Sequence, residues 1–274
     1  MDSGSTEELL QQKVRATEEN FWAVYSQFGR GPGCQLHDES DVVWFETPLT
    51  NLPYNGVIRA HLAEDAPVVV DRIVSHFRLR NVPFFWVVHP SATPRDLPRI
   101  LEERGVKLAE TLPGMTMDLA DLPTREECPF GFEIREVNSP DQLRPIQEMI
   151  VERWDVPEND RDVHFGITLS FGLGDPSSPY RAWAAYEDGE PVCKVLLNMI
   201  DGSAGIHGVA TKPAARGRGL ARVLTLHALH YARERGHRLG MLHSSAMARS
   251  LYEKIGFRAV ADFSIHVSSG DLHV

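Results

Sequence analysis

A cluster of cationic side chains stands beside two glycines in the segment KPAARGRGLARVL, which begins at Lys212. The cations are Lys212, Arg216, Arg218 and Arg222, and the glycines are Gly217 and Gly219. The chain has a formal net charge of −10, yet no Asp or Glu occurs between Asp201 and Glu234. Phosphate oxygens bind to cationic side chains and to free backbone N–H groups. The segment therefore predicts a site for an anion, most simply a pyrophosphate, with a solvated basic surface as the alternative.

The residues around this segment predict a strand, a glycine-rich turn and a helix in that order. GIHGVAT, residues 205–211, has the pattern of a strand, and an apolar stripe that starts at Leu220 continues to a helix end at Gly236. The first turn of a helix has N–H groups without partners inside the helix, and the helix dipole attracts anions there. Glycine lets the backbone come close to a ligand. The anion is therefore expected at the amino-terminal end of this helix.

Two common nucleotide-binding motifs do not fit the segment. A Walker A loop needs GxxxxGK[ST], and the chain contains neither Gly-Lys-Ser nor Gly-Lys-Thr. A dinucleotide fingerprint needs a third small residue where this chain has Arg222, and the next predicted strand, RLGMLHSS, does not end in an acidic residue. The pattern that remains is R-x-x-G-x-A, from Arg216 to Ala221.

On these residues the sequence resembles the GCN5-related N-acetyltransferases (GNAT). The acyl-CoA signature of that family, [RQ]-x-x-G-x-[GA], follows a strand that often ends in V-x-T-x-P, and this chain has Val209, Thr211 and Pro213 in that register. A second family motif, A-x-x-L-Y-x-x-x-G-F, occurs here as Ala248, Leu251, Tyr252, Gly256 and Phe257. The resemblance covers about residues 131–274. It implies an α/β (α+β) fold with a mixed, mostly antiparallel twisted sheet flanked by helices.

The resemblance implies acetyl-CoA as the acyl donor and transfer of its acetyl group to a primary amine. The cofactor-binding residues that it implies are Val209, Ala210, Thr211, Arg216, Gly217, Arg218, Gly219, Leu220, Ala221, Arg222 and Ser245. Many relatives have asparagine where this chain has Ser245. Tyr252 occupies the family's usual general-acid position, and a buried tyrosine that only orients the cofactor is the alternative.

The general base is harder to assign because the strand GIHGVAT contains no carboxylate. In the family that the sequence resembles, two central strands splay apart and the pantetheine arm of CoA lies in the gap between them. His207 is the only titratable side chain of this strand and, by alternation from Val209, lies on the face beside that gap. The ordinary pKa of histidine, about 6.5, suits a general base. We therefore predict His207 as a catalytic residue together with Tyr252, and the alternative is a core or surface histidine. His243, near the end of RLGMLHSS, is a second candidate.

The first half of the chain has no such loop, but it repeats part of the second half. Gly105 aligns with Gly256 at an offset of 151 residues, which places RILEERGVKL under SLYEKIGFRA. The predicted strand NGVIRAHL is followed by AEDAP, whose acidic residues would repel a pyrophosphate. We therefore predict two tandem acyl-CoA N-acyltransferase-like domains, residues 1–124 without a CoA site and residues 125–274 with the catalytic one. An unrelated α/β domain in the first half is the alternative.

The acceptor site is expected in the segment VERWDVPENDRDVHFGITLSFG, because the first two helices of the family shape it. Its acidic residues would attract a cationic amine, and two aromatic residues would form an apolar wall. These residues are Glu152, Asp155, Glu158, Asp160, Asp162, Trp154 and Phe165. We predict a small-molecule amine, such as an amino acid, an amine metabolite or an antibiotic-like compound; a protein lysine and a solvated acidic loop are the alternatives. Two other activities stay open: malonyl decarboxylation or thioester hydrolysis, and acyl-CoA sensing without turnover.

The composition argues against several other classes. A hydrophobic content of 42% indicates a globular protein, and the negative net charge argues against nucleic acid as a partner. Cys34, Cys128 and Cys193 lie far apart, so neither a disulfide framework nor a metal site is expected. The chain shows no signal-peptide pattern and no run of about 18 apolar residues, so we expect a cytoplasmic protein without a membrane partner. We expect a monomer with an internal pseudo-dimer, or a homodimer.

Overall fold

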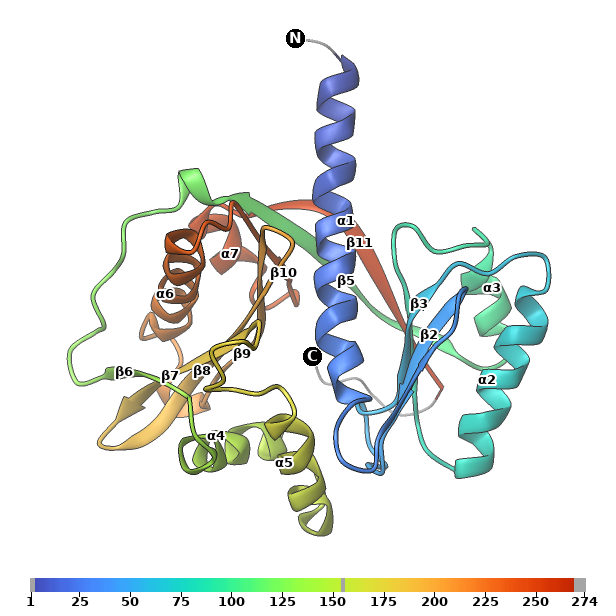
Figure 1. The fold of residues 1–274 in the computed structure, drawn as a ribbon, viewed down its shortest axis with the longest axis horizontal. Helices are drawn as coiled ribbons and strands as arrows, with labels where there is room; N and C mark the ends of the chain where they lie inside the picture. Colours follow the sequence, from blue (N-terminus) through green and yellow to red (C-terminus); the bar gives the residue numbers. More distant parts are fainter. Residues whose placement is uncertain (1–2, 154–155, 269–274) are drawn as a thin grey trace. The chain divides into compact units, whose positions relative to one another are not determined.

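The structure is a computed structural model that describes residues 3–153 and 156–268. These residues form two compact units, and each unit is assembled from separate segments of the sequence (Figure 1). Unit 1 consists of residues 3–20, 113–153 and 171–260, and unit 2 consists of residues 21–112, 156–170 and 261–268. The predicted domains 1–124 and 125–274 are continuous halves of the sequence, whereas each compact unit contains segments of both halves. The division into two tandem domains therefore stays a prediction.

The sheet of unit 1 is mixed and mostly antiparallel. Its strands lie in the order β5 (Lys107–Asp118), β10 (Leu239–His243), β9 (Ser203–Thr211), β8 (Glu190–Ile200), β7 (Tyr180–Glu187) and β6 (Glu133–Glu136). Among the neighbours described for these strands, every pair is antiparallel except β9 and β10, which are parallel. β7 and β8 form the hairpin that the Asp188–Gly189 pair predicts, with positive φ angles of 50° and 84° at its turn.

Helices cover the sheet of unit 1. They are α4 (Pro140–Arg153), α6 (Leu220–Glu234), α7 (Arg249–Ile255), the 3₁₀ turns η1 (Leu119–Asp121) and η3 (Pro213–Ala215), and residues 3–20 of α1 (Ser3–Phe28). The long helix α6 packs against β7, β8 and β9 through its predicted apolar stripe, with Leu224 and Leu229 fully buried (Figure 1). It ends one residue before its C-cap, Arg235, and Gly236 follows with a φ of +89°. The predicted strand, turn and helix are therefore confirmed.

The strands of unit 2 also pair in a mixed pattern. Its strands lie in the order β1 (Gln35–Asp38), β2 (Val42–Glu46), β3 (Gly56–Ala60), β4 (Phe85–Val88) and β11 (Arg258–Val267). Only β3 and β4 are parallel among the pairs described for these strands. The helices of this unit are α2 (Ala66–Arg80), α3 (Leu97–Glu102), η2 (Glu158–Asp160), α5 (Arg161–Leu169) and residues 21–28 of α1. Each unit thus has the predicted architecture of a mixed, mostly antiparallel sheet flanked by helices.

Two long strands connect the units along the chain. Residues 107–112 of β5 belong to unit 2 and residues 113–118 to unit 1, whereas β11 begins in unit 1 and continues in unit 2 from residue 261. Each strand follows a short helix and a glycine with positive φ, Gly105 at +76° and Gly256 at +127°. The two places therefore have the same local order of helix, glycine and strand, which the offset of 151 residues predicts.

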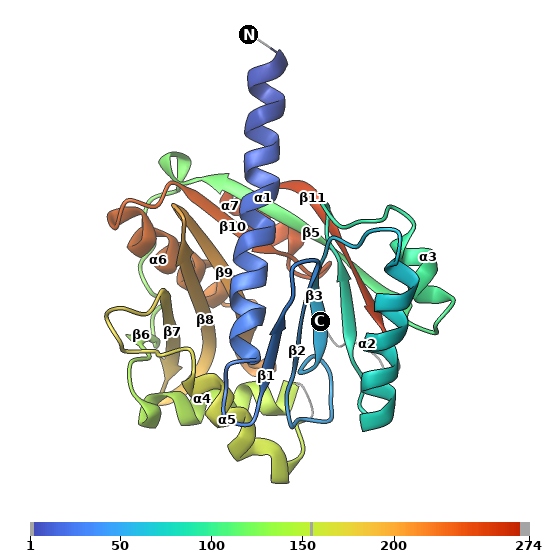
Figure 2. The same cartoon turned by 45° about the vertical axis from the view of Figure 1, so that its right-hand side comes forward.

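The longest helix was not predicted from the sequence. α1 is one continuous helix of 26 residues (Figure 2), and its last residues in unit 1 include Asn20, which is fully buried. Neither α1 nor another helix within residues 3–153 and 156–268 has the length and apolar character needed to cross a membrane.

Candidate functional site

A cleft of about 850 Å³ lies in unit 1 between the start of α6 and helix α7. The residues that line it are Met149, Val209, Ala210, Thr211, Lys212, Pro213, Ala215, Arg216, Gly217, Gly219, Leu220, Ala221, Arg222, Ser245, Met247, Ala248, Ser250, Leu251, Tyr252 and Lys254. The cleft therefore brings both sequence motifs together in space. Among the predicted cofactor-binding residues, Arg218 alone is not part of this lining.

The glycine-rich turn leaves the start of α6 open toward a ligand. Gly217 and Gly219 have φ angles of +75° and +81°, and a Cβ at either position would meet no atom within 4 Å. Gly219 is the N-cap of α6, and the first helical hydrogen bond runs from Val223 N to Gly219 O at 3.1 Å. The N–H groups of the three preceding residues, 220–222, thus lie before the first intrahelical bond. This helix end is preformed for an anion.

Strands β9 and β10 separate beside the cleft. Their parallel pairing runs from the Ser203–Leu239 pair to the Ile206–Leu242 pair, but β9 continues to Thr211 along β8. A β-bulge interrupts the β8–β9 register near Gly208, which has a φ of +54°. Backbone groups of residues 207–211 are consequently not taken up by β10. This separation matches the gap that the family resemblance implies for the pantetheine arm.

The cations of the loop differ in what they contact. Lys212 and Arg216 line the cleft, and Arg216 also donates from Nε to the Thr211 carbonyl at 3.3 Å. Arg222 lines the cleft while its Nε lies 2.8 Å from Oε1 of Glu126.

Arg218 has two contacts outside the cleft lining. Its Nη1 lies 2.8 Å from a carboxylate oxygen of Glu187, and its guanidinium lies 4.2 Å from the ring centroid of Phe132. The side chain of Arg218 is therefore held by protein partners, and only its backbone belongs to the glycine-rich turn.

Tyr252 lies in the cleft as a protonated phenol. Its side chain on α7 is 5% exposed and lines the cleft. Burial raises the pKa of Tyr252 to about 12, because the phenolate would lose its hydration. A group that stays protonated throughout the neutral range can donate a proton to a leaving group in the cleft.

The two candidate histidines lie outside the cleft lining described for unit 1. His207 on β9 is partly buried, and burial lowers its pKa to about 4. Burial and, second, the neighbouring His207 lower the pKa of His243 to about 3. The ordinary pKa expected for His207 from the sequence is therefore wrong, because the surroundings disfavour the charged imidazolium. Both rings are neutral at physiological pH, with one ring nitrogen each able to accept a proton.

The residues predicted for the acceptor site are divided between the units: Glu152 belongs to α4 of unit 1, and four of the others belong to unit 2. Trp154 and Asp155 fall outside the described residues, as does the side chain of Glu152. The others belong to η2 and α5 of unit 2, where Glu158, Asp160 and Asp162 are exposed or partly exposed and Phe165 is buried.

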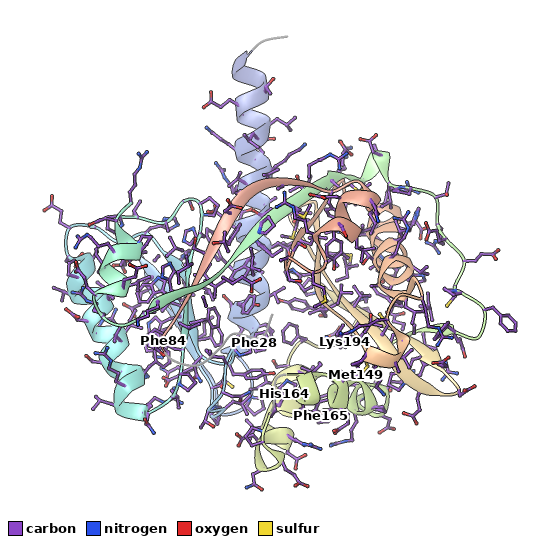
Figure 3. The ribbon with its side chains drawn as sticks, turned by 180° about the vertical axis from the view of Figure 1, so that it is seen from behind. Phe28, Phe84, Met149, His164, Phe165 and Lys194 are labelled. Carbon is purple, nitrogen blue, oxygen red and sulfur yellow. The ribbon has the colours of Figure 1, made fainter. Side chains whose placement is uncertain are left out.

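Several lining residues were not predicted. Ser250 and Lys254 occupy the variable positions of the Tyr252 motif, so helical spacing on α7 was a usable signal for them. Met149 comes from α4, which packs against β8; Figure 3 labels Met149 and the β8 residue Lys194. No signal in the sequence indicates that Met149 reaches this cleft.

Comparison with known proteins agrees with this geometry. Residues 143–257 match the acetyltransferase (GNAT) family. A segment of 98 residues is 36% identical to a mycothiol acetyltransferase from Beutenbergia cavernae, and it covers 34% of this chain and 32% of that protein. The match thus spans about a third of the length of the curated relative.

Solved structures share the fold over nearly the whole chain. A GCN5-related N-acetyltransferase from Kribbella flavida has a TM-score of 0.67 at 19% identity, with 93% of this chain and 96% of that chain covered. A tandem GNAT protein from the clavulanic acid biosynthesis pathway has a TM-score of 0.63 at 12% identity, with 96% and 97% covered. Residues 143–257 thus match the acetyltransferase (GNAT) family, both sequence motifs lie on one cleft, and the solved structures share the tandem fold.

Proposed function

We propose that the protein transfers an acetyl group from acetyl-CoA to a primary amine of a small molecule, in the class of amino acids, amine metabolites and antibiotic-like amines. The observation that carries this proposal is the cleft in which the open start of α6 and the phenol of Tyr252 lie together. The names of two similar proteins, a mycothiol acetyltransferase and a tandem GNAT protein of clavulanic acid biosynthesis, support a small-molecule acceptor.

The residues of the cleft fit acetyl-CoA. The N–H groups that start α6 suit the pyrophosphate, and Lys212 and Arg216 add positive charge beside them. The part of β9 beyond Ile206 offers backbone groups to the amides of the pantetheine arm. Acetyl-CoA supplies a thioester whose carbonyl carbon is open to attack by an amine.

The side chains of unit 1 then move two protons. As the amine nitrogen bonds to the acetyl carbon, it becomes cationic and acidic, and a neutral imidazole such as that of His207 accepts its proton. The carbon–sulfur bond breaks, and the Tyr252 hydroxyl protonates the departing sulfur. Water returns the phenol to its protonated form, which its raised pKa favours strongly. The products are an N-acetyl amide and free CoA thiol.

Incubation of candidate amines with acetyl-CoA, followed by mass spectrometry and a thiol assay, tests this proposal. An acetylated small-molecule amine together with an equal amount of free thiol is the expected result. Thiol without an acetylated product would instead indicate thioester hydrolysis. Binding of acetyl-CoA without thiol release across the amine panel would indicate a sensor.

Tyr252→Phe is expected to lower kcat by about 10- to 100-fold, which reaches the lower end of the range for general acid catalysis. The substitution removes only the hydroxyl, so the Kd for acetyl-CoA should stay unchanged. Steady-state kinetics and calorimetry measure the two quantities. Tyr186→Phe is the matched control, because Tyr186 is 7% exposed in the same unit but does not line the cleft. Equal kcat in the Tyr252 variant and the wild type would reduce Tyr252 to a packing role.

Glu126→Gln is expected to tighten acetyl-CoA binding. The Glu126 carboxylate holds Arg222, and an exposed ion pair of this kind is worth roughly 0.2–1 kcal/mol, so releasing the arginine should lower the Kd by up to about fivefold. Glu187→Gln removes the same charge but frees Arg218, which lies outside the cleft lining. Titration should show a lower Kd for the first variant only. The same decrease in both variants would mean that net charge alone acts.

A further inference from the structure

A buried polar cluster in unit 1 joins α1 to β8 and β9. Asn20 of α1 and Asn198 of β8 are both fully buried, and Ser203 at the start of β9 is 5% exposed. Asn20 contacts both of them, although they follow it by 178 and 183 residues in the sequence. Buried amides of this kind need their hydrogen bonds, since an unpaired one costs about 1–3 kcal/mol. The cluster therefore fixes the side chain of Asn20.

The hydrogen-bond partners determine which way the Asn20 amide points. Its Nδ2 donates to the backbone carbonyl of Asn198 at 3.3 Å and to Ser203 Oγ at 3.3 Å. A carbonyl oxygen only accepts, so the nitrogen of Asn20 must face it. The oxygen of Asn20 then lies on the other side, where it accepts from Nδ2 of Asn198 at 3.2 Å.

The same oxygen determines the tautomer of His207. Nε2 of His207 lies 2.8 Å from Oδ1 of Asn20. Because this oxygen only accepts, Nε2 must hold the proton. A neutral imidazole has a single N–H, so Nδ1 holds the free lone pair. The helix α1 thus sets which ring nitrogen of His207 can take up a proton.

A glycine on β9 makes room for this contact. A Cβ at Gly205 would overlap with Oδ1 of Asn20 and would lie 2.5 Å from its Cγ and 2.7 Å from Nε2 of His207. Only a residue without a side chain fits where the amide approaches the strand. The close approach of Asn20 therefore explains why position 205 is a glycine. This steric argument is independent of the hydrogen bonds, and both observations support the pairing of Asn20 with His207.

We propose that Asn20 is a positioning residue of the acetyl-transfer site, which holds His207 in the tautomer whose Nδ1 accepts the proton of the acceptor amine. This inference rests on the proposed function. The proton leaves the amine nitrogen as that nitrogen bonds to the acetyl carbon, and it moves to Nδ1 while Nε2–H stays bonded to Asn20. His207 later returns the proton to solvent.

Two titratable groups near His207 come from the neighbouring strands. His243 of β10 interacts electrostatically with His207. From β8, the Lys194 ammonium approaches Gly208, since a Cβ at Gly208 would lie 3.0 Å from its Nζ. α1 contributes the uncharged amide of Asn20. A negative charge introduced at position 20 would therefore be a new interaction with the imidazole.

Asn20→Asp and Asn20→Leu separate positioning from packing. Aspartate keeps an acceptor for Nε2–H and stabilises the imidazolium, so it should raise the pKa of His207, from about 4, by about one to three units. Since only the neutral ring is a base, the acid limb of the pH profile of kcat/KM should move to higher pH by that amount. Leucine removes the acceptor, and kcat should fall at least about tenfold, a part of the roughly 100-fold or more that a general base contributes. Acetyl-CoA affinity should stay unchanged in both variants.

Asn198→Ser is the matched control for damage to the cluster. Asn198 belongs to the same buried network but has no hydrogen bond to His207 among those described. It should lower the thermal stability without moving the acid limb. An acid limb that is the same in Asn20→Asp and the wild type would overturn the proposal.

The tautomer is also measurable without turnover. In ¹⁵N-histidine NMR spectra of the full chain, with His207 assigned by its loss in His207→Gln, Nε2 should hold the proton and Nδ1 should not. A proton on Nδ1 would overturn the role of Asn20. If the wild type shows the Nε2–H tautomer but His207→Gln keeps full activity, His207 is not the base. The two failures are therefore distinct.

Discussion

Gly219→Glu is expected to abolish measurable binding of acetyl-CoA at concentrations that saturate the wild type. Gly219 has a φ of +81° and begins α6 at the open end of the helix. A glutamate there places a negative charge and a whole carboxylate side chain where the pyrophosphate approaches. Charge-assisted hydrogen bonds contribute about 1.5–3 kcal/mol each, so losing two of them weakens binding by more than about 100-fold. Calorimetric titration measures the loss.

Gly236→Glu is the control for this experiment. Gly236 follows the other end of the same helix with a φ of +89°, and a Cβ there would also meet no atom within 4 Å. Both substitutions therefore add the same charge and a similar backbone strain, about 1–2 kcal/mol. Only the variant at position 219 should lose binding. Equal losses in both variants would assign the effect to stability and would contradict the phosphate site.

The same titration counts the cofactor sites. In unit 2, α2 starts at Ala66 directly after the acidic residues Glu64 and Asp65, and the Asp65 side chain makes no capping hydrogen bond. Carboxylates at this position repel a pyrophosphate. We therefore expect one acetyl-CoA per wild-type chain. Two sites per chain would contradict the predicted loss of CoA binding in the amino-terminal half.

Local chemistry made the phosphate loop and its surroundings predictable from the sequence. The positive φ angles at positions 217 and 219 favour glycine, and the Asp188–Gly189 pair favours a tight turn. The apolar stripe from Leu220 makes α6 amphipathic regardless of what surrounds it. Each of these features depends on residues within a few positions of one another, so a single sequence reports them.

The features that could not be predicted depend on residues far apart in the chain. Spacing placed His207 on the cofactor side of its strand, but the lowered pKa follows from burial under other elements. Likewise, the basic cluster indicated an anion site, yet Glu187 and Glu126 neutralise two of its arginines from other segments. Asn20 lies in a helix with no motif of its own. Such contacts are set by tertiary packing, which local patterns do not report.

The largest feature of this kind is that β5 and β11 each continue from one unit into the other. Because β5 ends in unit 1, the packing of unit 1 depends on the first half of the chain. Residues 114–118 of β5 pair with β10, from the Gly114–His243 pair to the Asp118–Leu239 pair. Four apolar side chains at and after this strand end lie in the core of the unit: Met115, Met117, Leu119 and Leu122. Together with Asn20 they precede the predicted catalytic domain of residues 125–274.

A fragment of residues 125–274 expressed alone is therefore expected to aggregate or to lack activity. Burying a large apolar side chain contributes about 1.5–3 kcal/mol, so removing the four side chains costs roughly 6–12 kcal/mol, comparable to the whole stability of a domain, about 5–15 kcal/mol. The loss also uncovers the edge of β10, where other chains can pair. Gel filtration, circular dichroism and the acetyl-transfer assay measure the outcome.

Co-expression with residues 1–124 is the control that identifies the cause. The break then falls in residues 122–129, a segment without helix or strand, and every strand of unit 1 is again present. Activity should return in the two-piece protein, because strand pairing does not require a continuous chain between the pieces. A soluble and fully active fragment of residues 125–274 would show that the first half is dispensable for stability and chemistry. It would also contradict the role of Asn20, since that fragment lacks α1 altogether.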